Sequence, residues 1–142
     1  MEQVVAKKSF IPLILEGIWM VLLLIFILIP NELPESMMIV VYIALGVLGV
    51  DVLWTIIRPL NIIKVKDHTF IISRLYQTIT ISYQDIEKID FYKATRRGLE
   101  FNYGTIKIHK KDGQKIRIME VGKVIDVYLK MDALMDEYTI NA

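Results

Sequence analysis

Two histidines, His68 and His109, are the side chains of this chain best suited to acid–base catalysis or metal binding. A nucleophilic triad needs a serine or cysteine beside a histidine and an acid, and the chain contains no cysteine. His68 lies in a short polar stretch typical of a tight turn, and His109 lies on the polar side of an alternating segment. Two isolated histidines also lack the spacing of zinc ligands. We therefore expect no catalytic residue, no metal and no cofactor, and we predict that the protein is not an enzyme.

Two carboxylates, Glu16 and Asp51, lie within long apolar stretches. If these stretches are antiparallel helices, both acids lie about 9 Å inside the same boundary. A carboxylate at the centre of a bilayer costs roughly 2.5–3.5 kcal/mol, so the two acids need an explanation. Two interpretations stay open. The acids form an intramembrane polar pair that shares a proton, in a small proton- or ion-linked membrane component. Alternatively, they stay hydrated near the interface, pair with Arg58 or form hydrogen bonds across an oligomer contact.

Basic side chains are the remaining candidates for binding. Each base near an anionic membrane surface contributes about 1 kcal/mol of attraction, so a cluster could contact lipid headgroups or, alternatively, a protein partner. The candidate contacts are Lys64, Lys66, Arg74, Lys107, Lys110, Lys111, Lys115 and Arg117. The alternative is an ordinary solvated strand face. The excess of positive charge is modest and no aromatic residues interleave with it, so we expect no nucleic-acid partner.

Charged residues are distributed unevenly along the 142 residues. Residues 10–57 contain four acids and neither lysine nor arginine, whereas residues 58–142 contain 15 basic and 11 acidic residues. The sequence therefore predicts three parts. These are a cytoplasmic N-terminal segment (1–9), an apolar hairpin (10–57) and a cytoplasmic domain (58–142).

The apolar part contains two stretches, 10–30 and 37–57, that are each long enough to cross a bilayer as a helix. The connector Asn31 to Ser36 is too short for anything but a tight turn, and Pro30 favours the end of the first helix. The first stretch exceeds the apolar core of a signal peptide, and no small-residue cleavage site follows it. We therefore predict a transmembrane helical hairpin in contact with the lipid bilayer.

Basic residues flank the hairpin on one side only. Lys7 and Lys8 precede the first stretch and Arg58 follows the second, whereas the connector carries two acids and no base. The positive-inside rule then predicts a multi-pass protein of the inner or plasma membrane with both termini in the cytoplasm.

Short segments of alternating apolar and polar residues follow Pro59. Strands are predicted at 63–66, 70–73, 78–82 and 86–91, with a turn at Asp67 to Thr69. Such strands, close together in sequence, are typical of an antiparallel sandwich or barrel.

A hairpin is predicted around Lys111-Asp112-Gly113. A two-residue turn would pair apolar with basic residues, whereas a three-residue loop pairs Ile108 with Ile116 and Ile106 with Ile118 on one face. That loop needs Gly113 in the left-handed conformation. We therefore expect the three-residue hairpin.

The last segment has apolar residues at steps of three and four, which predicts an amphipathic helix. The stripe consists of Val124, Val127, Tyr128, Met131, Leu134, Met135 and Tyr138. The sequence thus predicts a membrane α-helical hairpin followed by an all-β sandwich or barrel that a C-terminal helix closes.

Two runs, ITISYQDIEKIDF and GTIKIHKKDGQKIRIMEVGKVIDVYLKM, resemble the bacterial pleckstrin-homology-like domains of small membrane proteins. The features in common are a strand ending at Asp85-Ile86, Gly104-Thr105 at the start of a long hairpin, and Val121-Gly122 before the final helix. The resemblance covers residues 58–138, and paired transmembrane helices ahead of such a domain are typical of the family.

The resemblance implies a fold more than an activity. Our leading hypothesis is a membrane-anchored, non-enzymatic interaction module that docks a protein partner or forms a homo-oligomer at the cytoplasmic membrane face. One alternative is that the basic hairpin senses anionic lipid headgroups. The other is the proton- or ion-linked component that would use Glu16 and Asp51.

Overall fold

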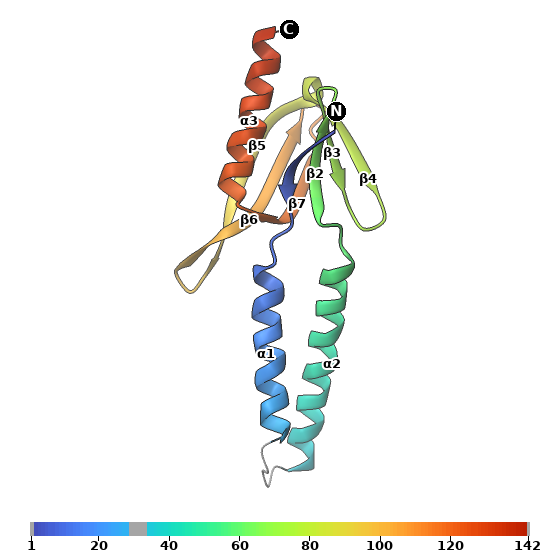
Figure 1. Cartoon of the computed structure of the whole chain (residues 1–142), viewed down its shortest axis with the longest axis vertical. Coiled ribbons are helices and arrows are strands. Elements are labelled where there is room, and N and C mark those ends of the chain that lie inside the picture. The colour runs from blue at the N-terminus through green and yellow to red at the C-terminus, as the bar shows by residue number, and fades with distance from the viewer. Residues whose placement is uncertain (1, 29–33, 142) are drawn as a thin grey trace. The chain divides into compact units, whose positions relative to one another are not determined.

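The computed structural model describes residues 2–28 and 34–141. The chain forms two compact units, one of residues 10–58 and one that combines residues 1–9 with residues 59–142 (Figure 1). The expected break at Pro30 and the first half of the 31–36 connector lie outside the described residues.

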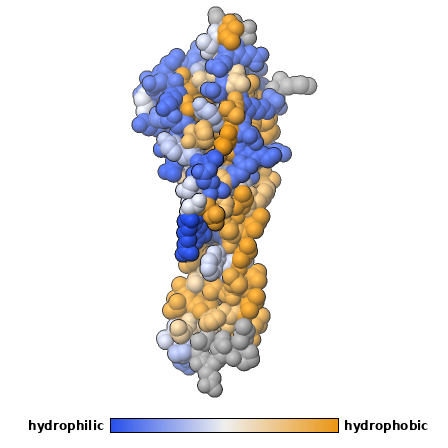
Figure 2. All heavy atoms as spheres, turned by 90° about the vertical axis from the view of Figure 1, so that its left-hand side faces the viewer, coloured by the Kyte–Doolittle hydropathy of each residue, from blue (hydrophilic) through white to orange (hydrophobic). Residues whose placement is uncertain are grey.

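The first unit contains helices α1 (Ile11–Leu28) and α2 (Glu35–Ile57). Both are long and apolar enough to cross a membrane. Thr55 is the one buried residue of the two helices over their described length, so their apolar side chains point outward. Figure 2 shows this apolar surface over the helices and a mostly hydrophilic surface over the β unit. The expected pair of long apolar helices is confirmed.

The second unit begins with an antiparallel sheet in the order β1-β2-β3-β4. Its strands are β1 (Gln3–Lys7), β2 (Asn61–Lys66), β3 (Thr69–Ser73) and β4 (Thr78–Ser82). Lys66 pairs directly with Thr69, so the turn between β2 and β3 has two residues where three were expected.

Strand β1 was not expected, because residues 1–9 were treated as a separate segment. It pairs with β2 from Gln3↔Val65 to Lys7↔Asn61 and buries Ala6 in the core. The apolar run of β1, Val4 to Ala6, is too short to show the two-residue period of a strand. Its partner strand lies more than 50 residues away in the sequence. Neither feature is visible to local pattern analysis.

A second antiparallel sheet has the order β5-β6-β7. Its strands are β5 (Ile86–Arg96), β6 (Leu99–Lys110) and β7 (Lys115–Gly122), and a short 3₁₀ turn, η1 (Tyr83–Asp85), precedes β5. Strand β5 continues five residues beyond the predicted end at Phe91 and turns at Arg97-Gly98. The extension contains a β-bulge between Lys93 and Thr95, which interrupts the alternation of its side chains.

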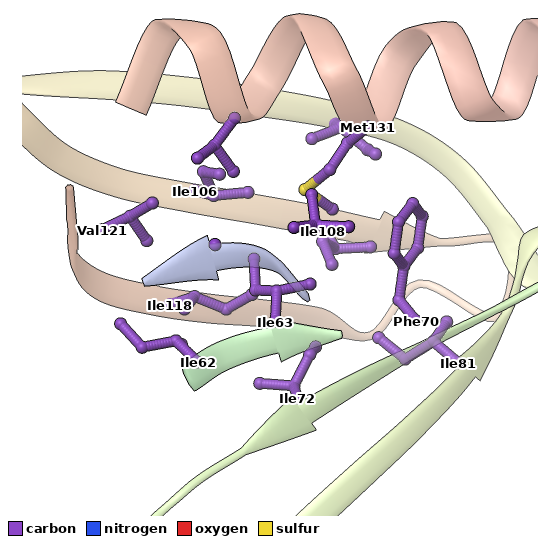
Figure 3. Packing of buried hydrophobic residues seen from close by; sticks show 14 of the residues in the cluster. Ile62, Ile63, Phe70, Ile72, Ile81, Ile106, Ile108, Ile118, Val121 and Met131 are labelled. Carbon is purple, nitrogen blue, oxygen red and sulfur yellow. The ribbon is translucent and has the colours of Figure 1, made fainter. Parts of the chain in front are cut away.

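Helix α3 (Val124–Asn141) packs its predicted stripe on the second sheet and on β1. Figure 3 shows Met131 of α3 pointing toward Ile106, Ile108 and Phe70, with Ile72 and Ile81 of the first sheet beyond them. The side chains labelled in that view belong to one continuous apolar core. The expected order of apolar helices, antiparallel strands and C-terminal helix is therefore confirmed.

The barrel alternative is wrong, because both sheets are open in the described part of the unit. The isolated bridge Lys8↔Val121 joins them at one corner, where Ser9 N donates to Glu120 O at 2.8 Å. At the other corner, the chain leaves β4 through η1 rather than by strand pairing. The architecture is a sandwich of two open sheets with a covering helix.

The three-residue hairpin is confirmed. Ile106 pairs with Ile118 and Ile108 with Ile116, and Gly113 has a φ of 83°. Gly104, farther along β6, lies so close to β5 that a Cβ atom would overlap the carbonyl oxygen of Tyr92. Both glycines are therefore required by backbone geometry.

A first prediction tests the place of β1 in the unit. Ala6→Asp puts a carboxylate where the side chain is 1% exposed, so we expect a loss of at least about 2 kcal/mol in stability. Amide hydrogen exchange of Ile63 in the full chain in micelles measures it. Gln3→Asp, at the exposed end of β1, is the control, and the Ile63 amide should keep its protection from exchange in this variant. Unchanged protection of Ile63 in Ala6→Asp would show that β1 is dispensable.

A second prediction concerns the tip of the β6–β7 hairpin. Gly113→Val should destabilise the β unit by about 1–2 kcal/mol, because a β-branched residue resists a positive φ. Gly113→Asn is the matched control, since asparagine tolerates this conformation. Thermal unfolding of the full chain, followed by the amide signal of Ile108, measures both. Equal midpoints for the two variants would contradict the role assigned to Gly113.

Candidate interaction surfaces

The outer face of the β5-β6-β7 sheet is rich in basic residues. Strand pairing places Asp90, Lys107 and Arg117 in one row, and His109 beside Lys115 in the next. Side chains on these positions share the face opposite the core. We call this surface the basic face, and its cations are Lys88, Lys107, Lys115 and Arg117.

Arg74, in the loop between β3 and β4, adds a cation beside the basic face. Its Nη2 donates a hydrogen bond of 3.1 Å to the carbonyl oxygen of Arg117. This contact places the guanidinium of Arg74 at β7, although 43 residues separate the two in the sequence. The structure therefore brings together four of the eight predicted contacts, namely Arg74, Lys107, Lys115 and Arg117.

Asp90 is the acid within the basic face. Lys88 Nζ lies 2.8 Å from one carboxylate oxygen of Asp90, and His109 Nε2 lies 3.1 Å from the other. The hydrogen bond from Lys88 is the main reason that the pKa of Asp90 is lowered and that of Lys88 is raised. Asp90 therefore stays ionised and balances Lys88, while Lys107, Lys115 and Arg117 supply the excess charge of the face.

Two large side chains interrupt the charges. Tyr92 is 50% exposed and Met119 is 52% exposed. The Nζ atom of Lys107 lies 4.3 Å from the centre of the Tyr92 ring, a cation–π contact that fixes this lysine over β5. The face thus combines cations with exposed apolar area.

The predicted contacts at the hairpin tip have local partners. Lys110 Nζ lies 2.6 Å from Asp112 Oδ2, and the backbone N of Gln114 donates to Asp112 Oδ1 at 2.9 Å. The hydrogen bond from Lys110 lowers the pKa of Asp112, so the pair is neutral overall. Lys111 is exposed, while its backbone N donates to the carbonyl of Asp85.

The two remaining predicted contacts lie on the first sheet. Lys64 Nζ is 2.9 Å from Glu2 Oε1, and Lys66 is exposed at the end of β2. Neither belongs to the basic face. The eight residues proposed from sequence therefore divide between two sheets and a hairpin tip.

A second group of lysines surrounds the start of α3. Lys7, Lys8, Lys123 and Lys130, with Asp126, line a cleft of about 620 Å³. We call it the lysine cleft. Lys8 is buried there, with its Nζ 3.9 Å from Glu120 Oε2. Sequence reasoning missed this site because it depends on β1, which carries the first two lysines to α3.

The two acids of the helices differ in exposure. Glu16 of α1 is half-buried and Asp51 of α2 is exposed. Their exposure does not indicate a shared environment, and the polar pair stays a prediction.

The histidines lie in two different settings. His109 is part of the basic face, and His68 lies in the β2–β3 turn beside the rings of Tyr83 and Tyr138. Among residues 2–28 and 34–141, no three His, Asp or Glu side chains are grouped so as to hold a metal ion.

Comparison with protein-family models and with curated proteins finds no match. The likeness to pleckstrin-homology-like domains is therefore a prediction that rests on the motifs in the sequence.

Proposed function

We propose that this protein is a membrane-anchored, non-enzymatic interaction module that docks an acidic protein surface on its basic face. The β unit acts as a pleckstrin-homology-like domain at the cytoplasmic side of the inner or plasma membrane. The observation that carries the proposal is the grouping of Lys107, Lys115, Arg117 and Arg74 around exposed Tyr92 and Met119.

The composition of the face supports protein binding. Tyrosine, methionine and arginine are enriched at protein interfaces, where large side chains supply contact area and arginine supplies directed hydrogen bonds. The cations around them attract an acidic partner and set the orientation of docking. One core joins both sheets and α3, and this packing favours a preorganised face.

The two apolar helices support a membrane anchor. Their outward side chains include Ile14, Leu22, Ile39 and Val47, all more than 49% exposed, which water would not tolerate over two helices of this length. Bases on the flanks and acids in the connector favour cytoplasmic termini. The anchor would concentrate the module at the membrane, where weak contacts suffice for assembly.

The test is co-purification from native membranes in mild detergent, followed by mass measurement of the complex. Lys107→Glu with Arg117→Glu reverses two charges of the face and should weaken partner binding by about tenfold or more. Lys66→Glu with Lys111→Glu makes the same change at exposed sites elsewhere and should leave binding within about twofold.

Equal retention of the partner by both double variants would reject the basic face as the docking surface. A complex whose mass is a multiple of the chain would identify a second copy as the partner. Exposed acids of α3, namely Asp126, Asp132, Asp136 and Glu137, would then be the complementary surface.

The lysine cleft supports a second candidate function, recognition of an anionic lipid headgroup. Four lysines and one aspartate line it, and the first turn of α3 adds the partial positive charge of a helix N-terminus. Lys7 and Lys8 precede α1 by only a few residues, so these cations are held near the point where the chain would enter the bilayer.

Lipid selectivity of the cleft can be measured on the full chain in nanodiscs. Spin-labelled anionic lipid should broaden the amide signals of Lys123 and Lys130 more than spin-labelled zwitterionic lipid does, and salt should reduce the difference. Lys123→Gln with Lys130→Gln should abolish the selectivity, whereas Lys111→Gln with Lys115→Gln should retain it. If the Lys111 and Lys115 variant loses the selectivity and the Lys123 and Lys130 variant keeps it, lipid sensing belongs to the basic hairpin. Equal broadening by both lipids would exclude headgroup recognition from the lysine cleft.

A further inference from the structure

A small pocket lies where the β2–β3 turn, η1 and the C-terminal half of α3 meet. Its volume is about 330 Å³. The lining residues are Val65, Asp67, His68, Tyr83, Leu134, Glu137 and Tyr138. We call it the ring pocket. It shares no residue with the basic face or the lysine cleft.

Three aromatic rings form the wall of the ring pocket. The ring centres of His68 and Tyr138 are 5.0 Å apart, those of Tyr83 and Tyr138 are 5.7 Å apart, and those of His68 and Tyr83 are 6.0 Å apart. Tyr83 meets each of the others nearly edge to face, so the rings form a corner rather than a stack.

Hydrogen bonds hold the corner in place. The backbone N of Tyr83 donates to the carbonyl oxygen of His68 at 3.0 Å, and Gln84 Nε2 donates to the hydroxyl of Tyr138 at 2.6 Å. Asp67 and His68 adopt φ values of 48° and 57°, which turn the chain sharply at this point. The rings are therefore preorganised by the backbone and by a side chain that does not itself line the pocket.

The hydroxyl group of Tyr83 is buried without a hydrogen-bond partner among the described residues. Tyr83 is only 5% exposed, yet it lines the pocket. Burial, and next the negative charge of Glu137, raise the pKa of Tyr83, so the hydroxyl is neutral at physiological pH.

Two acids line the pocket. Asp67 and Glu137 contribute carboxylates, and neither lysine nor arginine is among the described residues of the lining. Aromatic faces combined with carboxylates attract organic cations, because the ring quadrupole and the acid charges act in the same direction. An anion would meet repulsion from both acids. The chemistry therefore selects a cation with apolar substituents.

We propose that the ring pocket binds an alkylammonium group, held by the rings of His68, Tyr83 and Tyr138 and by the carboxylates of Asp67 and Glu137. A small organic ammonium compound, primary or quaternary, or a lysine side chain carries this group. The site is independent of the proposed docking on the basic face, because the two surfaces share no residue.

The test is a titration of the full chain in micelles with n-butylammonium chloride and, separately, with tetramethylammonium chloride. Backbone amide shifts of Asp67, His68, Tyr83 and Tyr138 report binding. Sodium chloride keeps the ionic strength constant, and tert-butanol serves as the neutral probe of similar size. We expect saturable shifts at these four residues with at least one ammonium probe, and none with tert-butanol at the same concentration.

Charge variants sharpen the test. Glu137→Gln should weaken binding by about fivefold, as expected for loss of one nearby charge in a solvent-accessible site. Asp132→Asn removes an exposed acid of the same helix outside the pocket and should change binding less than twofold. Asp67→Asn is a second pocket variant that keeps the turn, because asparagine tolerates a positive φ.

Tighter binding of n-butylammonium would assign the site to primary amines of the lysine type, and tighter binding of tetramethylammonium would assign it to quaternary amines. Either result supports the proposal. Absence of saturable shifts at tens of millimolar with both probes would overturn it. Equal shifts with tert-butanol, or equal weakening by Asp132→Asn and Glu137→Gln, would overturn it as well.

Discussion

The pairing of β1 with β2 is the interaction on which the rest of the β unit depends. Lys7 lies opposite Asn61, so this pair closes a loop that contains both apolar helices. The entropy cost of closing a loop grows only slowly with its length, and two antiparallel helices return the chain toward its starting point. Strand β1 can therefore pair with β2 at a small entropy cost, although both helices lie between the two strands in the sequence. In return, β1 covers the free edge of β2 and buries Val5 and Ala6.

The same strand joins the two sheets. Beyond Lys7, the chain bridges to Val121 of β7 before it enters α1, so β1 contacts both layers and α3. Neither sheet closes on itself, and this corner is where their edges meet. The lysine cleft is a consequence, because its walls are β1 on one side and the start of α3 on the other. A chemical site that combines residues 7–8 with residues 123–130 exists only through this tertiary contact.

The sequence predicted those features that local periodicity encodes. Both apolar helices, the register of the β6–β7 hairpin and the stripe of α3 are fixed by residues close together along the chain. Apolar pairing alone decided between two hairpin registers, because Ile106 and Ile108 had to share a face with Ile118 and Ile116. Periodicity missed strand β1 and the end of β5, because the first pairs with a strand beyond the helices and the second contains a β-bulge.

Prediction of the sites was less complete for a related reason. A cluster of bases on neighbouring strands could be foreseen, and the structure does group Lys107, Lys115 and Arg117. Arg74 joins them through a backbone carbonyl, and that contact depends on how the two sheets pack. The rings of His68, Tyr83 and Tyr138 come from a turn, a 3₁₀ segment and a helix. The sequence analysis placed His68 in a polar turn and Tyr138 in the apolar stripe of the last helix, so a pocket between them could not be foreseen.

Opposite charges on one rigid unit have a consequence for recognition. The basic face lies on the outer side of β5-β6-β7, whereas acids line the ring pocket between the β2–β3 turn and α3. Screening at physiological ionic strength limits each field to about 8 Å, so the two surfaces act separately on whatever approaches them. An anionic partner and a cationic group are therefore not competitors for one site. A single partner carrying an acidic patch and a projecting lysine could engage both, and its orientation on the unit would then be fixed by charge alone.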